Sequence, residues 1–208
     1  MKEIWYVRHG ETEWNAQRRF QGHLDVPLSP VGIGQAFRLA ERLSRSRISF
    51  DRLYASDLRR ARQTAEPLAQ VLGLPIATTP LLREIHVGEL AGLTRAEARF
   101  PSFLAEAAKD PWNARRPGGE SMADLARRLQ AFLEEVPPGR HLVVTHGGVI
   151  RAALKLALDL AGDTWRRFHI QNTSITRILY PENAVLTVAD AAHLEVWADW
   201  LSDEDLKG

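Results

Sequence analysis

Two histidines in this 208-residue chain stand directly after apolar runs that have the composition of buried strands. His9 follows Ile4-Trp5-Tyr6-Val7 and Arg8, and His146 follows His141-Leu142-Val143-Val144-Thr145. An imidazole can accept a phosphoryl group covalently, and a neighbouring guanidinium can hold the phosphate oxygens. Taken singly, a histidine in this position is more often a loop or packing residue, so the prediction depends on what else the chain supplies.

Other groups that bind phosphate follow the predicted strand ends. One predicted helix opens with Arg59, Arg60 and Arg62, and Gly147-Gly148 opens another whose free amides favour anions. The carboxyl ends of parallel strands meet at one edge of a sheet, so these groups can converge there although they are far apart in sequence. Phosphate is the simplest ligand for such a set. A run of arginines on a helix is also common as a solvated face, and this interpretation stays open.

The composition is typical of a single soluble globular domain. Apolar residues make up 45% and charged residues 25% of the chain, and the formal net charge is +1. A charge so close to zero gives no field that would recruit nucleic acid or an anionic membrane. The chain has no cysteine, which excludes disulfides and thiolate nucleophiles and fits a reducing compartment. No apolar run has the length of a signal-peptide core or a membrane span, so we expect a cytoplasmic protein.

The sequence predicts helices that alternate with strands. Ser29-Pro30 is a typical helix start, and Gly73 followed by Pro75 is a typical stop. Thr94–Glu97 and Ser121–Asp124 resemble capping boxes that open two further helices. Strands are expected over 4–7, 51–55, 75–78, 141–145, 174–180 and 184–189, and helices over 30–43, 57–72, 95–108, 122–135 and 149–160.

This alternation favours an α/β protein, with helices on both faces of a mostly parallel sheet in a three-layer α/β/α sandwich. The last two strands, joined by a turn at 181–183, are expected to run antiparallel. The sequence contains no internal repeat and no interdomain linker, so we expect one domain over residues 1–208. A Pro/Gly-rich stretch at 111–119 belongs to a helical lid, an excursion from this domain over about 93–120.

Short motifs extend this pattern over nearly the whole chain. They are RHGETEWN (8–15), FQG (20–22), DVPLS (25–29), SDLRRARQTA (56–65), LREIHVGE (82–89), PGGES (117–121), VTHGG (144–148) and NTS (172–174). In this order they resemble the histidine phosphatase superfamily, in its phosphoglycerate-mutase-like branch. Any one motif is weak, whereas the ordered set is specific. The resemblance implies the phosphoglycerate mutase-like fold and phosphoryl transfer through a histidine.

The resemblance also implies a role for each matching residue. His9 resembles the nucleophile that becomes a phosphohistidine, and Glu84 resembles the acid that protonates the leaving oxygen and later activates water. The phosphoryl oxygens would be held by Arg8, Arg60, His146 and the amide of Gly147, with Asn15, Gln21 and Gly22 as further substrate-binding positions. Arg60 is preferred to Arg59 because the family's arginine directly precedes the alanine of this motif, here Ala61.

The implied chemistry requires a neutral His9. Nearby arginines should favour that form because they disfavour an imidazolium. The second ring nitrogen then needs an orienting acceptor, which the sequence does not reveal. Positioned donors and an acid suffice for the transfer without metal or cofactor, and the sequence carries no metal-binding or nucleotide-binding motif. Glu84 is alternatively a surface partner of Arg83.

Two activities of this superfamily have to be separated. A phosphatase passes the phosphoryl group to water, whereas a cofactor-dependent phosphoglycerate mutase passes it to a second hydroxyl. The chain is compact between Gly92 and Glu120, where glycolytic mutases carry a longer insert, and its 18–22 segment resembles broad-specificity phosphatases and α-ribazole phosphatase. We therefore predict a metal-independent phosphomonoesterase acting on small phosphorylated metabolites, with the mutase as the alternative. Arg115 and Arg116 favour the mutase, since they resemble paired arginines that hold its substrate carboxylate.

A noncatalytic regulator is a remote alternative. Arginine pairs at 59–60, 115–116, 127–128 and 166–167 can form a surface for RNA or an acidic protein, although no aromatic-basic RNA motif accompanies them. We therefore predict no nucleic-acid and no membrane partner. The sequence leaves the natural substrate open, and it does not decide between a monomer and a homodimer.

Overall fold

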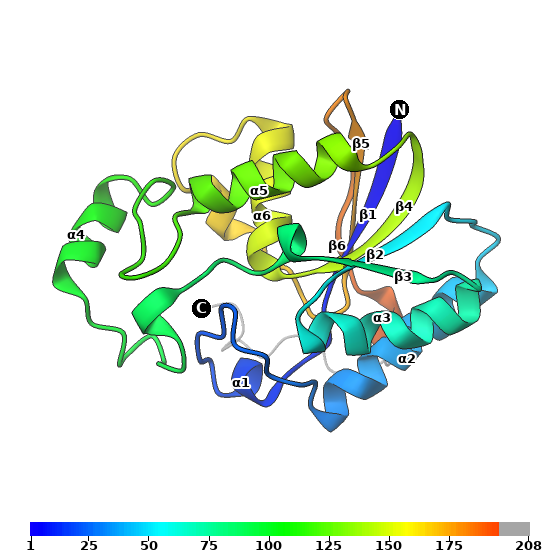
Figure 1. Ribbon diagram of the computed structural model, residues 1–208, viewed down its shortest axis with the longest axis horizontal. Helices are drawn as coiled ribbons and strands as arrows, with labels where there is room; N and C mark the ends of the chain where they lie inside the picture. The colour runs from blue at the N-terminus through cyan, green and yellow to red at the C-terminus, as the bar shows by residue number, and fades with distance from the viewer. Residues whose placement is uncertain (196–208) are drawn as a thin grey trace.

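Six strands form one mixed sheet in the computed structural model, which describes residues 1–195 (Figure 1). Their order across the sheet is β3-β2-β4-β1-β5-β6. The first four in this order pair parallel, β5 pairs antiparallel with β1, and β6 pairs antiparallel with β5. The antiparallel final pair is therefore confirmed. The strands are β1 Lys2–Arg8, β2 Arg52–Ser56, β3 Ile76–Thr79, β4 Gly139–Thr145, β5 Ile175–Tyr180 and β6 Ala184–Asp190.

Helices cover both faces of this sheet. Successive side chains of a strand point to opposite faces, so β1 contributes to two cores. Ile4 and Tyr6 share one core with two helices, and Trp5 and Val7 share the other core with two more. The three-layer α/β/α sandwich is thus confirmed. The first pair of helices is α5 (Met122–Glu135) and α6 (Gly147–Leu158), and the second pair is α2 (Pro30–Arg45) and α3 (Arg59–Leu72).

The starts of α2 and α5 agree with the sequence signals. The Gly32 amide donates to Ser29 Oγ at 3.1 Å at the start of α2. Ser121 and Asp124 form a reciprocal capping box at the start of α5. Each cap satisfies backbone N–H groups that have no partner within the helix, which is why these residue types begin helices.

The helix expected over 95–108 is wrong at its start. Thr94 and Glu97 do exchange the hydrogen bonds of a capping box, but the chain makes only a turn there, and α4 spans Pro101–Lys109. A proline disfavours helical backbone in the residue before it, so Phe100 stays extended and the helix begins at the proline. None of the residues of α4 is buried, and the helix lies away from the sheet at the left edge of Figure 1.

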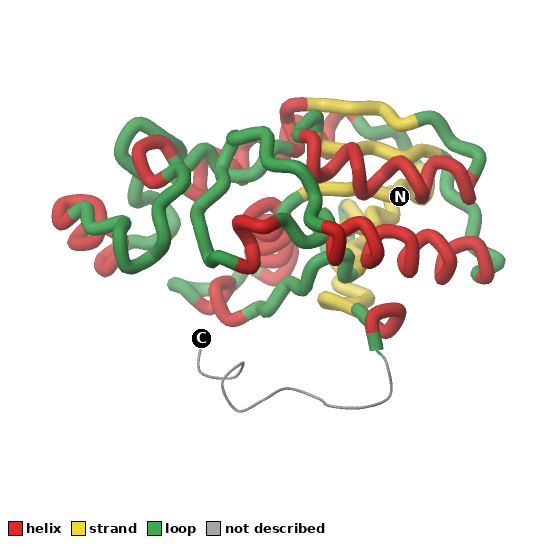
Figure 2. Tube along the Cα trace, turned by 90° about the horizontal axis from the view of Figure 1, so that it is seen from below, coloured by secondary structure: helices red, strands yellow, loops and turns green. Residues whose placement is uncertain are grey.

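Long loops, with some of the short helices among them, lie at one end of the molecule, to the left in Figure 2. The segment 80–93, for which neither a helix nor a strand was expected, contains two 3-10 turns, η1 (Pro80–Leu82) and η2 (Gly88–Leu90). The four-residue helix α1 (Glu13–Ala16) was not expected. Two further 3-10 turns are η3 (Thr164–Arg167) and η4 (Ala192–Leu194).

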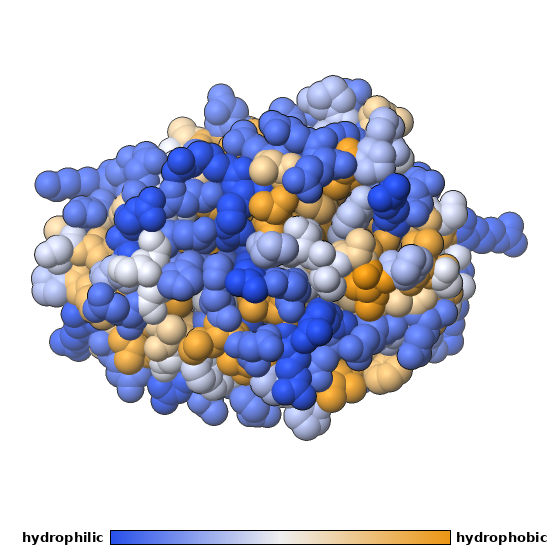
Figure 3. All heavy atoms as spheres, viewed as in Figure 1, coloured by the Kyte–Doolittle hydropathy of each residue, from blue (hydrophilic) through white to orange (hydrophobic). Residues whose placement is uncertain are grey.

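The surface is mostly hydrophilic on the face seen in Figure 3, where apolar side chains appear in scattered groups. Over residues 1–195, none of the helices has both the length and the apolar character needed to cross a membrane.

Candidate active site

His9 lies where β1 ends, and its ring is fixed by the next residue of the chain. The side chain is only 3% exposed, and its Nδ1 lies 2.6 Å from the Gly10 carbonyl oxygen. A carbonyl oxygen can only accept, so Nδ1 carries the proton and donates it to Gly10. The Nε2 nitrogen of a neutral ring then carries the lone pair. The orienting acceptor that the sequence did not reveal is this backbone carbonyl.

His146 lies beside His9 because their strands are neighbours. β1 and β4 pair in parallel with Arg8 opposite Thr145, so the residues after them emerge together. The two imidazole centroids are 5.1 Å apart, and the rings are inclined at 59°. The predicted convergence of the two strand-end histidines is therefore confirmed.

Both histidines are neutral in this setting. Burial lowers the pKa of His9 well below its usual range, and the charges of Arg60 and Arg8 lower it further. Burial also lowers the pKa of His146, again with added effects from Arg60, His9 and Arg8. A charged group that loses water and faces cations is disfavoured, which is why the imidazolium forms are unstable here. A neutral His9 is a nucleophile, whereas an imidazolium is not.

Arg60 is the largest fully buried side chain of the described structure. It lies in the first turn of α3 and donates from Nη1 to the Leu24 carbonyl and from Nη2 to the Gly22 carbonyl, both at 2.8 Å. Its Nε is buried without a hydrogen-bond partner among the described residues. Burial lowers the pKa of Arg60 to about 10, while Glu84 opposes the shift, so the side chain stays charged at neutral pH.

Arg8 places a second guanidinium at the same end of the sheet. Its Nη1 donates to the Ile170 carbonyl at 2.6 Å, and its Nε is also buried without a partner among the described residues. Burial and the neighbouring Arg151 lower the pKa of Arg8 to about 10. Two guanidiniums with buried, unused N–H groups, next to two neutral imidazoles, form a setting that favours an anion.

Glu84, in the segment after η1, brings its carboxylate to the start of α6, next to the strand ends that carry His9 and His146. Its Oε1 accepts from the Ile85 amide at 2.8 Å and its Oε2 from the Gly148 amide at 3.1 Å. Arg83 instead forms a two-point ion pair with Asp57, at 2.8 and 2.6 Å. The alternative in which Glu84 pairs with Arg83 on the surface is therefore wrong. The carboxylate is tied to the first turn of α6, the helix that follows His146.

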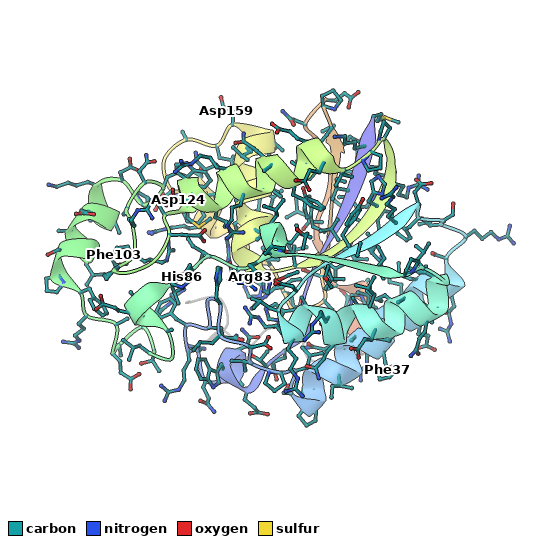
Figure 4. All side chains as sticks on the ribbon, viewed as in Figure 1. Phe37, Arg83, His86, Phe103, Asp124 and Asp159 are labelled. Carbon is teal, nitrogen blue, oxygen red and sulfur yellow. The ribbon has the colours of Figure 1, made fainter. Side chains whose placement is uncertain are left out.

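An ion pair holds the segment that carries Glu84. Arg128 of α5 contacts both carboxylate oxygens of Glu120, at 2.8 and 2.9 Å, and donates to the carbonyls of Leu81, Arg83 and Glu84. Glu120 also accepts from the His86 amide at 2.9 Å. Figure 4 shows Arg83 and His86 on this segment in the middle of the molecule, between α3 and α4.

The remaining predicted positions differ in what their side chains do. Gln21 is 8% exposed and its Oε1 has no partner among the described residues. Gly22 has φ +52°, and a Cβ there would meet Val87 Cγ2 at 2.6 Å, so only glycine fits where its carbonyl holds Arg60. Asn15 Oδ1 accepts from the amide and the hydroxyl of Thr12, so this part of the side chain is used in a helix cap.

Gly147 lies at the first position of α6, next to two guanidiniums. A Cβ on Gly147 would lie 3.4 Å from Nη1 of Arg151 and 3.6 Å from Nε of Arg8. Arg151 was not predicted, although it stands four residues after Gly147 and therefore on the same face of the helix. Ser56, which contacts His146, was also missed, although it follows the apolar run of a predicted strand as the two histidines do.

Arg115 and Arg116 diverge. Arg115 is exposed and forms an ion pair with Asp124 at 2.7 Å. Arg116 is half-buried and lies over the Phe103 ring of α4, with its guanidinium carbon 6.0 Å from the ring centre. Burial lowers the pKa of Arg116, and the charge of Glu84 opposes this shift. Of the two, Arg116 therefore packs against α4 within the 93–120 segment, while Arg115 pairs with α5.

Known proteins resemble this chain over nearly all of its length. The sequence profile described as histidine phosphatase superfamily (branch 1) matches residues 4–190. The probable phosphoglycerate mutase GpmB of Yersinia pestis (strain Pestoides F) is 37% identical, over 94% of this chain and 96% of its own.

Solved structures agree with the observed fold. A phosphoglycerate mutase from Thermus thermophilus is 36% identical with a TM-score of 0.70, over 89% of this chain and 97% of its own. The mycobacterial glucosyl-3-phosphoglycerate phosphatase Rv2419c, solved with VO3, is 34% identical with a TM-score of 0.74, over 86% and 93%. The relatives thus bear the names of two different activities, and the finer likeness to broad-specificity phosphatases stays a prediction.

Proposed function

The chain belongs to branch 1 of the histidine phosphatase superfamily, and on this premise we propose that it hydrolyses small phosphate monoesters through a phosphohistidine on His9. One observation carries the proposal. The His9 ring is buried and neutral, and its Nδ1 is fixed by a hydrogen bond to the Gly10 carbonyl. The lone pair on Nε2 is therefore free to attack phosphorus, next to the His146 ring and near the guanidiniums of Arg8 and Arg60. A nucleophile that is already desolvated and oriented loses little freedom on reaching the transition state.

The reaction takes two steps. In the first, His9 Nε2 forms a bond to phosphorus while the bond from phosphorus to the leaving oxygen breaks, and Glu84 gives that oxygen a proton. In the second, water attacks the phosphohistidine, Glu84 takes a proton from the water, and inorganic phosphate leaves a neutral His9. The charge on the transferring oxygens is stabilised by Arg8, Arg60, His146 and the Gly147 amide. Each such donor contributes about 3 kcal/mol, and a placed acid contributes a factor of roughly a hundred or more.

The lid would choose the substrate. We include residues 93–120 in the proposal as a cover for the site, because α4 packs no buried residue against the sheet and the half-buried Arg116 of the same segment lies within reach of the charge of Glu84. Arg115 is held outside by Asp124. This divergence supports the phosphatase, since the mutase alternative uses both arginines on one substrate carboxylate.

A phosphoglycerate mutase is the second candidate, favoured by the names of GpmB and of the Thermus thermophilus structure. Its chemistry differs only in the second step, where a hydroxyl of the substrate replaces water. Parallel assays for release of inorganic phosphate and for exchange between 2- and 3-phosphoglycerate separate the two. Profiling of phosphate release from sugar phosphates, 3-phosphoglycerate, α-ribazole phosphate and nucleotides then identifies the substrate.

The central test is His9→Ala with p-nitrophenyl phosphate. We expect a loss of more than about a thousandfold in kcat, since the covalent route is closed. His169→Ala is the matched control, because His169 is exposed, and it should keep wild-type activity. A folded His9→Ala protein that hydrolyses this substrate at the wild-type rate rules out the phosphohistidine.

Glu84→Ala tests the acid. Alkyl phosphates have poor leaving groups that need the proton, whereas p-nitrophenol leaves without one. The variant should therefore lose more activity on alkyl phosphates than on aryl phosphates. Equal losses on both would remove Glu84 from this role.

A further inference from the structure

Ser56 is a buried hydroxyl that contacts one of the two site histidines. It ends β2, next to β4 in the sheet, and has no exposed surface. Its Oγ lies 2.8 Å from Nε2 of His146 and accepts a longer hydrogen bond, 3.3 Å, from the Leu58 amide. The Nδ1 of His146 is buried and has no hydrogen-bond partner among residues 1–195. His146 is therefore anchored through one ring nitrogen only.

The hydrogen-bond inventory of this pair decides where the proton of the ring lies. A serine hydroxyl has one proton to donate, and a neutral imidazole has one N–H and one lone pair. If Nε2 carried the proton, the Ser56 hydroxyl would have two donors aimed at it and no acceptor for its own proton in the described structure. That arrangement leaves two groups unpaired, the serine proton and the Nδ1 lone pair. If Ser56 donates to Nε2, only the N–H on Nδ1 is unpaired, and each buried polar group without a partner costs free energy. The second arrangement is therefore favoured.

We propose that Ser56 is a positioning residue that donates to Nε2 of His146 and so keeps the proton of this ring on Nδ1. The proton-bearing nitrogen then faces the side of the ring that is not occupied by Ser56. Arg60 and Arg8 lie near enough to His146 for their charges to lower its pKa. Nδ1 is buried without a partner in the described structure, and an N–H on it could donate to a phosphoryl oxygen, whereas a lone pair on it would repel that oxygen.

The hydrogen-bond partners of the two histidines thereby give the rings opposite roles, one as a nucleophile and one as a hydrogen-bond donor. In His9 the Gly10 carbonyl accepts from Nδ1 and leaves a lone pair on Nε2 for phosphorus. In His146 the Ser56 hydroxyl donates to Nε2 and leaves a proton on Nδ1 for oxygen. Both rings are neutral, and both carry the proton on Nδ1. The rings differ in the nitrogen that makes no hydrogen bond within the described structure, which is Nε2 in His9 and Nδ1 in His146.

The kinetic part of this inference rests on the proposed function, so the deciding measurement needs no turnover. Nitrogen NMR on protein labelled with [15N]histidine distinguishes a ring protonated on Nδ1 from one protonated on Nε2. The signals of His146 are assigned by their loss in His146→Gln. We expect wild-type His146 to carry its proton on Nδ1, and a proton found on Nε2 overturns the proposal.

Three variants at position 56 test the hydroxyl. Ser56→Ala and Ser56→Cys remove the strong donor with little change of size, and both should shift His146 towards protonation on Nε2. Ser56→Thr keeps the donor and should restore the wild-type signals. Ser174→Ala is the matched control, because it removes another fully buried serine hydroxyl, one that donates to the Gln171 carbonyl at 2.7 Å. It should lose a similar amount of thermal stability and leave the His146 signals unchanged.

Anion binding and turnover complete the test. Titration with inorganic phosphate should show binding to Ser56→Ala weakened about tenfold, and kcat for an alkyl phosphate should fall by a similar factor or more, while Ser56→Thr recovers both. His146 signals that stay unchanged in Ser56→Ala would refute the role of Ser56. If the tautomer and phosphate binding behave as expected but no substrate is hydrolysed, the proposed function fails and the inference about Ser56 stands.

Discussion

Gly148→Ala should separate activity from stability in this protein. The Gly148 amide donates to Glu84 Oε2 at 3.1 Å, and a Cβ on Gly148 would lie 2.1 Å from Glu84 Oε1 and 3.1 Å from its Cδ. Contacts this short do not occur, so the carboxylate has to move by about 1 Å or more. Because the clashing atoms end a flexible side chain, the backbone can stay in place.

In Gly148→Ala, two opposing effects change the free energy of unfolding, and the displaced carboxylate lowers kcat. Alanine in a helix is favoured over glycine by up to about 1 kcal/mol, while the carboxylate gives up one hydrogen bond worth about 1.5 kcal/mol. The free energy of unfolding should therefore stay within about 2 kcal/mol of the wild type. A misplaced acid loses most of its contribution, so kcat on alkyl phosphates should fall about a hundredfold.

Gly34→Ala is the matched control. Gly34 also lies within a helix, but a Cβ there meets no atom within 4 Å. This variant should unfold about 2–4 °C higher, with unchanged kinetics. The assays are thermal unfolding, and steady-state hydrolysis of p-nitrophenyl phosphate and of an alkyl phosphate. A Gly148→Ala protein with wild-type kcat on the alkyl phosphate would refute the idea that the place of the Glu84 carboxylate matters.

Three further predictions concern the site and its supports. Since burial keeps the pKa of His9 below that of an unfolded histidine, the unfolded chain takes up an extra proton as the pH falls below about 6.5, and stability declines. His9→Gln removes this titration, so the free energy of unfolding should fall less steeply with pH, by roughly 1.4 kcal/mol per pH unit between pH 6.5 and the native pKa of His9. The free energy of unfolding is measured with urea at pH 5 to 8, and a slope equal to that of the wild type would contradict the prediction. Arg128→Leu removes the partner of Glu120 and the donor to three carbonyls, so it should destabilise the protein by about 3 kcal/mol and lower kcat. Calorimetry that shows no loss would count against this support of the Glu84 segment. Gly10→Ala places a Cβ 2.5 Å from the Gly32 backbone oxygen and should cost about 2 kcal/mol or more, which a wild-type urea midpoint would disprove.

Much of the fold follows from local patterns. The apolar runs of β1 and β4 predicted strands because both faces of these strands are covered, and the caps at Ser29 and Ser121 predicted helix starts because they satisfy backbone amides locally. The same kind of signal misleads at α4. The capping box at Thr94 forms, but Pro101 keeps the residue before it extended, so the helix begins at the proline and not after Thr94.

Residue types and their order predicted which groups the candidate site contains: the two strand-end histidines, the arginines at 8 and 60, and the carboxylate at 84. Packing in three dimensions determined how each is used. The ring nitrogen that carries the proton depends on which atom lies within hydrogen-bond distance of the ring. For His9 this atom belongs to the adjacent residue Gly10, but for His146 it belongs to Ser56, which is 90 residues away in the sequence. The same holds for Arg115, which is exposed and pairs with Asp124, and for its neighbour Arg116, which is half-buried over the Phe103 ring. Residue type fixes what a side chain can donate or accept, and packing fixes the partner.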